Sequence, residues 1–177
     1  MKKLIIAIIL FFIMIIPTKA LPLPIDVTAD SVVLYNLDKD QIIYSKNPDK
    51  VQILASLTKI MTAYTVIENV ENLNKTVTIT EKDIANLYGF TCIGLEPGNK
   101  ISYMDLLYGT ILESGADASQ ALAIHTAGSI EEFNKMMNEE AKELGLRNTN
   151  FEDSYGGHDD NVSTAREMAI LLKAALK

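Results

Sequence analysis

The stretch LASLTKIMTAY (residues 54–64) places a serine and a lysine three residues apart at the start of an apolar helix pattern. Three residues are just under one helical turn, so Ser56 and Lys59 project from neighbouring points on one face. Polar side chains at the start of a buried helix either cap the helix or take part in a reaction. The apolar positions behind them follow the three-and-four spacing of a buried helix face. They are Leu57, Ile60, Met61, Tyr64 and Ile67.

Ser56 and Lys59 are the residue types that nucleophilic catalysis needs. A serine hydroxyl is a poor nucleophile until a base removes its proton. A lysine is such a base only if its ammonium group loses a proton near neutral pH, which burial near a helix N-terminus favours. The alternative is an N-cap serine beside a solvated lysine. On spacing alone, that alternative is the better interpretation.

Residues 1–20 have the layout of a secretory signal peptide. Lys2 and Lys3 precede an apolar run of 13 residues (4–16), and the segment ends on the small residue Ala20. Such a run is too short to span a bilayer comfortably, so we expect cleavage after Ala20 and export. The alternative is an uncleaved membrane anchor, because Thr18 occupies the place where a small residue usually precedes the cut.

The remaining residues, 21–177, are enough for one domain with a real core. They carry 13 basic and 23 acidic side chains, a net charge of −10. A chain this acidic is not expected to present the basic surface that binds nucleic acid or anionic lipid headgroups. No cofactor is expected.

Histidine and cysteine usage gives no sign of a metal centre or a disulfide. His125 and His158 are far apart in sequence and lack ligand spacing, so no metal site is predicted. Cys92 is the only cysteine, which excludes an internal disulfide. We expect its thiol in or near the core rather than in catalysis, because a nucleophilic cysteine needs a base nearby.

The order of predicted elements indicates an α+β fold. Two runs rich in β-branched and aromatic residues, SVVLYNLD (31–38) and QIIYSKN (41–47), predict a hairpin with its turn at 37–40. TVTIT (76–80) alternates like a short strand, and NTNFEDSYGGHDD (148–160) is interpreted as a polar loop. Periodicity and capping patterns predict helices over about 54–69, 80–89, 102–113, 117–127, 129–145 and 164–177.

The last predicted helix has an apolar face that needs a cover. Its members are Met168, Leu171, Leu172 and Ala175. The hairpin is also isolated, and two strands form only a marginal sheet. Both observations predict sheet-forming sequence beyond residue 177. The alternative is a compact, mostly helical domain with a hairpin on one side.

Four consecutive segments resemble those of the low-molecular-weight D-alanyl-D-alanine carboxypeptidases, in the same order. They are SVVLYNLDKDQIIYSKNPD, ASLTKIMTA, LEPGNKISYMDLLYGTILESGADAS and LGLRNTNFEDSYGGHDDNVSTAREMA. ASLTKIMTA also resembles the nucleophile motif of the wider group of penicillin-binding proteins and serine β-lactamases. The resemblance covers residues 27–177. It implies the β-lactamase/DD-peptidase-like transpeptidase fold, here an N-terminal hairpin plus helical part without the C-terminal sheet strands.

The resemblance also implies roles for individual residues. Ser56 would attack the carbonyl of the penultimate D-alanine of a peptidoglycan stem peptide, and Lys59 would take its proton. Water would then hydrolyse the acyl-enzyme and release a peptide one D-alanine shorter. The family's Ser-x-Asn motif falls on Ser114-Gly115-Ala116, where Ser114 would relay a proton to the leaving amine. The alternative is that Ser114 is a turn residue between two helices.

Location and partners follow from the same resemblance. The protein would act on the extracytoplasmic side of the bacterial envelope, on stem peptides ending in D-Ala-D-Ala, with β-lactams as inhibitors. Membrane contact would come only through the N-terminal segment or through a C-terminal anchor that this sequence does not contain.

Two departures from the family pattern bear on substrate binding. Ala116 replaces the motif's asparagine, so this weak substrate-binding position loses a polar contact that can be worth on the order of a hundredfold in rate. Asp117 is a poor replacement, because a carboxylate beside Lys59 would raise the lysine pKa. The third motif, Lys-Thr-Gly, does not occur in the sequence. In the family its lysine holds the substrate carboxylate, and its strand supplies one of the two oxyanion-hole amides.

Three functions therefore compete. The first is a serine-type D-Ala-D-Ala carboxypeptidase, represented by part of its catalytic domain. The second, favoured by Ala116 and the missing motif, is a pseudoenzyme that binds peptidoglycan or penicillin without turnover. The third is a serine β-lactamase, which ranks last because no glutamate context resembles that family's deacylation motif.

Overall fold

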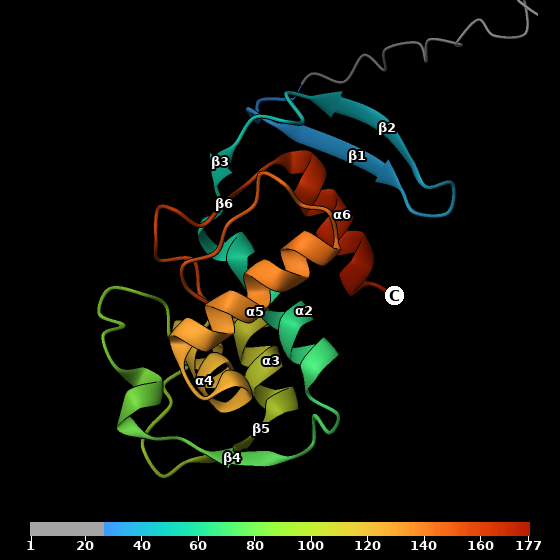
Figure 1. The fold of residues 1–177 in the computed structure, drawn as a ribbon. Coiled ribbons are helices and arrows are strands. Elements are labelled where there is room, and N and C mark those ends of the chain that lie inside the picture. The colour runs from blue at the N-terminus through green and yellow to red at the C-terminus, as the bar shows by residue number, and fades with distance from the viewer. Residues whose placement is uncertain (1–26) are drawn as a thin grey trace, which may run out of the picture.

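The computed structural model describes residues 27–177, so the predicted signal peptide lies outside the described part. The elements follow one another along the chain as a hairpin, a helical part with short strand pairs, and a final helix (Figure 1). The strands are β1 (Val32–Asn36), β2 (Gln41–Lys46), β3 (Gln52–Ile53), β4 (Thr76–Thr78), β5 (Lys100–Ser102) and β6 (Val162–Ser163). The 3-10 turns are η1 (Ala55–Leu57) and η2 (Glu81–Ile84), and the α-helices are α2 (Thr58–Asn69), α3 (Tyr103–Leu112), α4 (Ala116–Ala127), α5 (Ile130–Glu143) and α6 (Ala165–Ala175).

The predicted hairpin is confirmed. β1 and β2 pair antiparallel from Val32↔Lys46 to Asn36↔Gln41, with a register shift after Leu34. Within the described residues each sheet has only two strands, the others being β3 with β6 and β4 with β5. β1 lies beside α6, so the hairpin forms one end of the molecule (Figure 1).

Helix α4 is the centre of the helical part. It packs against α2, α3 and α5, and its first eight residues are buried. Its small side chains allow this close approach, because an alanine-rich surface brings helix backbones together. On α3, Gly109 continues the same close packing, since a Cβ there would lie 3.3 Å from the Cβ of Ala118. The fully buried side chains around this centre include Met61, Leu106, Leu122, Phe133, Met137, Phe151 and Leu171.

Side-chain caps begin three of the helices where the sequence predicts them. The hydroxyls of Ser102, Ser129 and Thr164 accept hydrogen bonds from the backbone of the third residue along, starting α3, α5 and α6. The predicted helix over 80–89 is wrong in length, because the structure has only the short turn η2 there. The Gln120 side-chain amide donates to the carbonyls of residues 82, 83 and 85, which fastens this turn to α4.

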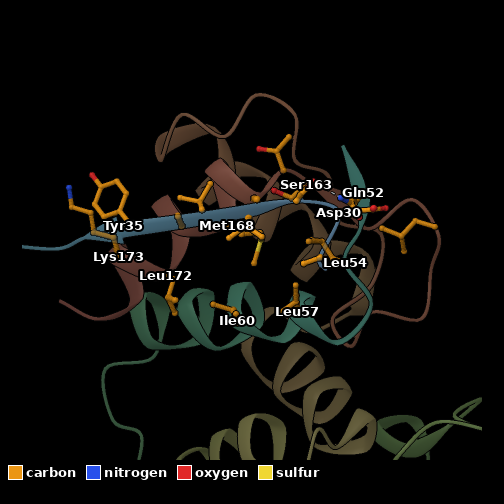
Figure 2. Close-up of a pocket in the computed structure, with 18 of the residues that line it drawn as sticks. Asp30, Tyr35, Gln52, Leu54, Leu57, Ile60, Ser163, Met168, Leu172 and Lys173 are labelled. Atoms are coloured by element: carbon orange, nitrogen blue, oxygen red, sulfur yellow. Dashed lines mark hydrogen bonds between the residues drawn. The ribbon is translucent and has the colours of Figure 1, made fainter. Parts of the chain in front are cut away.

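An apolar groove of about 660 Å³ runs between β1, α6 and the first turns of η1 and α2. Figure 2 shows Leu57, Ile60, Met168 and Leu172 directed toward it from these elements. The predicted apolar face of α6 is therefore divided. Leu171 is fully buried in the core, whereas Leu172 is 45% exposed at the groove.

Candidate active site

Ser56 lies on η1, the turn that leads into α2, rather than on a regular helix from residue 54 as predicted. The turn begins with a left-handed alanine, Ala55, at φ +46°. This conformation is uncommon for a residue with a Cβ and persists only where the surroundings enforce it. Ala55 packs against Gly156, at φ +86°, where a Cβ would lie 1.9 Å from the Ala55 carbonyl oxygen. The Ser56 turn and the 155–157 loop are thus packed backbone to backbone.

The three sequence-predicted polar side chains meet at one point. Lys59 Nζ donates to Ser56 Oγ at 3.4 Å, and Ser114 Oγ donates to the same oxygen at 3.1 Å. Ser56 is exposed, so a ligand has access to its hydroxyl. Lys59 is only 4% exposed. The solvated-lysine alternative is therefore wrong, and Ser56 caps neither η1 nor α2.

Lys59 has a second acceptor that sequence reasoning missed. Its Nζ donates to the Tyr155 carbonyl at 2.6 Å, so the amine is bound to a hydroxyl and a carbonyl rather than to a carboxylate. Burial lowers the pKa of Lys59 from its ordinary value, and the nearby negative charge of Asp153 opposes this by raising it. The net direction is downward, which favours the uncharged amine that a general base requires.

The loop carrying Tyr155 is organised by one carboxylate. Asp153 accepts hydrogen bonds from the backbone N–H groups of four residues, 155 to 158, at 2.5–2.9 Å. A second anchor is Thr62 on α2, whose hydroxyl donates to the Ser154 carbonyl at 2.6 Å. The sequence describes this segment only as polar and glycine-bearing. The sequence signal for a loop wrapped around a carboxylate was Asp153 followed closely by the glycine pair Gly156 and Gly157.

Ser114 is held between α3 and α4 in a left-handed conformation, with φ +57°. The following residue, Gly115, donates to the Gly109 carbonyl at 3.0 Å, and its own carbonyl accepts from the Ser119 hydroxyl at 2.8 Å. Ser114 is therefore a turn residue, as the alternative held, and also a contact of Ser56. Strained backbone of this kind is concentrated at functional sites.

The comparison with known families is decisive for classification. A family model described as D-alanyl-D-alanine carboxypeptidase matches residues 17–177. The chain belongs to the D-alanyl-D-alanine carboxypeptidase family.

Individual members of the carboxypeptidase family are similar over most of this chain. It is 38% identical over 152 residues to D-alanyl-D-alanine carboxypeptidase DacF of Bacillus subtilis, covering 84% of this chain and 39% of the relative. It is 38% identical over 159 residues to D-alanyl-D-alanine carboxypeptidase DacC of Escherichia coli, covering 85% of this chain and 40% of the relative. It is also 32% identical over 160 residues to a D-alanyl-D-alanine endopeptidase of Pseudomonas aeruginosa, covering 90% of this chain and 51% of the relative. The chain thus spans about 40–50% of the length of these relatives.

Solved structures give the same answer for the fold. Penicillin binding protein 6B from Escherichia coli matches with a TM-score of 0.83 and 33% identity, over 88% of this chain and 52% of that one. Penicillin binding protein 5 from Haemophilus influenzae matches with a TM-score of 0.82 and 35% identity, over 87% of this chain and 46% of that one. The predicted α+β, DD-peptidase-like fold is confirmed, in a form with a hairpin and a helical part.

Ala116 stands where the family motif has asparagine. It is buried in the first turn of α4, and its N–H donates to the Thr91 carbonyl at 2.7 Å. Asp117 does not reach Lys59. Its carboxylate accepts from the backbone N–H groups of residues 93, 94 and 95 at 2.9–3.0 Å. The charge that acts on Lys59 comes from Asp153 instead.

The prediction that Cys92 is a core thiol is wrong, because its side chain is exposed. The neighbouring Ile93 takes the inward position. A Cβ on Gly109 or Gly115 would lie within 2.8 Å of the Ile93 side chain. Ile93 therefore fills the packed position beside α3, and Cys92 lies at the surface.

The two histidines lie apart in the structure as well. His125 Nε2 is 3.3 Å from the Asp83 carboxylate, whereas His158 Nδ1 is 3.7 Å from that of Asp160. Across residues 27–177 no group of three or more histidine, cysteine, aspartate or glutamate side chains is placed to hold a metal ion. In the same range, no helix has both the length and the apolar character needed to cross a bilayer.

Proposed function

We propose that residues 21–177 are part of the catalytic domain of a serine-type D-Ala-D-Ala carboxypeptidase in which Ser56 forms the acyl-enzyme. The observation that carries this proposal is the shared contact at Ser56 Oγ, with Lys59 Nζ at 3.4 Å and Ser114 Oγ at 3.1 Å. Family membership supports the reaction class. The substrate would be a peptidoglycan stem peptide ending in D-Ala-D-Ala.

In this mechanism the uncharged Lys59 amine takes the Ser56 proton while Oγ attacks the carbonyl of the penultimate D-alanine. A positioned general base of this kind contributes about 10²–10⁴-fold in rate. Ser114, which contacts the same oxygen, relays this proton from Lys59 to the nitrogen of the departing D-alanine, so that the C–N bond breaks as the ester to Ser56 forms. Water then attacks the ester carbonyl, and Ser56 regains its proton as the shortened peptide leaves.

The described residues supply the proton-transfer side of this reaction. The N–H of Ser56, in the η1 turn, is one oxyanion-hole donor that the family resemblance implies. That resemblance places the second donor, and the group that holds the terminal carboxylate, on a Lys-Thr-Gly strand that is not in this sequence. Complete turnover is therefore proposed for the whole protein of which these residues form the nucleophile-bearing part.

A second candidate is a pseudoenzyme that binds penicillin or peptidoglycan without turnover. The specific observation in its favour is Ala116, whose buried methyl group makes no hydrogen bond where the family has asparagine. Free D-alanine separates the two candidates. Its release from a D-Ala-D-Ala peptide supports the carboxypeptidase, whereas saturable binding without release supports the pseudoenzyme.

Location is part of the same proposal. Residues 1–20 would direct export, and the mature protein would act on the extracytoplasmic side of the bacterial envelope, where β-lactams reach it as inhibitors. Amino-terminal sequencing of the mature protein tests this directly. A mature terminus at Leu21 supports a cleaved signal peptide, and retention of Met1 contradicts it.

Covalent labelling tests the catalytic proposal. The whole protein that contains residues 21–177 is incubated with a fluorescent penicillin, and the labelled peptide is identified by mass spectrometry. The expected result is one adduct on Ser56 that is lost in Ser56→Ala. A protein that is folded by circular dichroism but gains no adduct at saturating penicillin contradicts the proposal.

A further inference from the structure

Lys59 and Asp153 are joined through a single peptide group. The carbonyl of Tyr155 accepts a hydrogen bond from Lys59 Nζ at 2.6 Å, and the N–H of Gly156 donates to Asp153 Oδ1 at 2.5 Å. This carbonyl and this N–H belong to the same amide. A donor on the oxygen and an anion on the N–H polarise an amide in the same direction, so each contact strengthens the other.

Asp153 acts here as a carboxylate anion. Both of its oxygens are surrounded by N–H donors, namely the four backbone amides of residues 155–158 and the side-chain amide of Asn161 at 3.0 Å. No acceptor among these five partners could take a carboxyl proton, and an ionised carboxylate is acceptor-only. Asp153 is buried, with 8% of the residue exposed, so water screens this charge weakly.

The same hydrogen bonds fix where the Tyr155 carbonyl points. Asp153 holds the loop in the conformation that places Gly156 at φ +86° and against the Ala55 carbonyl. The Tyr155 carbonyl is then directed at Lys59. One side chain thus supplies both the orientation of the acceptor and the charge behind it.

Other carboxylates do not compete for Lys59. Those on α2 and on the helices packed against it are either bound to other groups or exposed. Hydrogen bonds from other residues occupy the carboxylates of Asp105, Asp117, Glu140 and Glu167. The exposed ones are Glu68, Glu113, Glu131, Glu132, Glu139 and Glu143. Asp153 is the charged group, among the described residues, whose field acts on Lys59.

We infer that Asp153 is a positioning residue for Lys59, which holds the Tyr155 carbonyl against the amine and places a negative charge behind that carbonyl. The inference deepens the proposed function and rests on it for its catalytic meaning. Its structural content, the coupling of Lys59 to Asp153 through one peptide group, does not require that Ser56 react. Asp153 itself contacts no reacting atom in this scheme.

Nuclear magnetic resonance tests the coupling without any activity assay. In protein with ¹³C-labelled lysine, the Cε resonance reports the titration midpoint of Lys59. Asp153→Asn keeps the shape of the side chain and removes its charge, so the Lys59 midpoint is expected to move to lower pH. Asp159→Asn is the matched control, because it removes an exposed charge from the same loop, and it should leave the midpoint in place. An unmoved midpoint in Asp153→Asn, or equal shifts in both variants, would overturn the inference.

A wild-type measurement covers the case in which Asp153→Asn does not fold. The amide resonance of Gly156 should titrate with the same midpoint as the Lys59 Cε resonance, because deprotonation of Lys59 removes a charged donor from the Tyr155 carbonyl. The amide of Gly145, which donates to the Lys142 carbonyl outside this network, should not follow that midpoint. A Gly156 resonance that ignores the Lys59 titration contradicts the coupling.

The two proposals fail separately. Coupled titration with no penicillin adduct would remove the carboxypeptidase and leave the positioning role of Asp153. An adduct on Ser56 with an uncoupled Lys59 would remove that role and leave the enzyme. In an active protein, Asp153→Asn should also move the pH–rate profile of Ser56 acylation to lower pH, which a purely structural role for Asp153 would not do.

Discussion

The site around Lys59 and the groove beside α6 lie on neighbouring surfaces of α2 but are built in opposite ways. At the site, polar groups are buried and hydrogen-bonded to a loop far away in sequence. At the groove, large apolar side chains such as Leu57 and Leu172 are half exposed (Figure 2). The difference teaches that contacts within residues 27–177 hold Ser56, Lys59 and Ser114 together, whereas the side chains that line the groove are only partly packed.

The largest expected effect comes from breaking the backbone contact behind Ser56. In Gly156→Ala the new Cβ would lie 1.9 Å from the Ala55 carbonyl oxygen, at a φ of +86°. We expect a loss of about 4 kcal/mol or more in the free energy of unfolding, measured by urea denaturation.

Gly128→Ala is the matched control for this variant. It has the same φ of +86° but nothing within 4 Å of the new Cβ. It should cost only about 1–2 kcal/mol, the penalty of the left-handed conformation itself. Equal losses in the two variants would show that the close approach to Ser56 contributes nothing.

A pair of leucines on α6 sharpens the contrast between core and groove. Leu171→Ala removes a fully buried side chain and should cost about 2–5 kcal/mol in urea denaturation. Leu172→Ala, one residue along and 45% exposed at the groove, should change stability by about 0.5 kcal/mol or less. A large loss from Leu172→Ala would mean that the groove is closed in solution.

The buried amine should also make stability depend on pH. Because the pKa of Lys59 is lowered on folding, the unfolded chain binds more protons between the folded and the unfolded pKa values. The Lys59 contribution to the free energy of unfolding should therefore rise with pH through that window. It is measured as the difference between wild type and Lys59→Met, and a difference that stays flat with pH would contradict the burial of an uncharged amine.

Local features of the fold could be predicted from sequence, and long-range ones could not. The caps at Ser102, Ser129 and Thr164 each depend on a residue three positions away, and the hairpin depends on adjacent runs. The role of Asp153 arises instead from a hydrogen bond between Lys59 and a residue 96 positions later. No periodicity in the sequence encodes such a contact.

The candidate site divides in the same way. The three-residue spacing of Ser56 and Lys59 predicted that these side chains lie close together, and the family resemblance predicted that Ser114 joins them. The direction of the Asp117 side chain depends on where the loop 93–95 passes. The exposure of Cys92 depends on which of two adjacent side chains packs against α3, which is a tertiary choice.

The pH dependence of Ser56 acylation by a penicillin tests the central claim, a buried and uncharged Lys59 acting on Ser56, most directly. The acylation rate constant should rise with pH through a single midpoint below the ordinary lysine pKa and equal to the Lys59 midpoint found by nuclear magnetic resonance. A rate that does not change with pH, or a midpoint at the value of an exposed lysine, would contradict the claim.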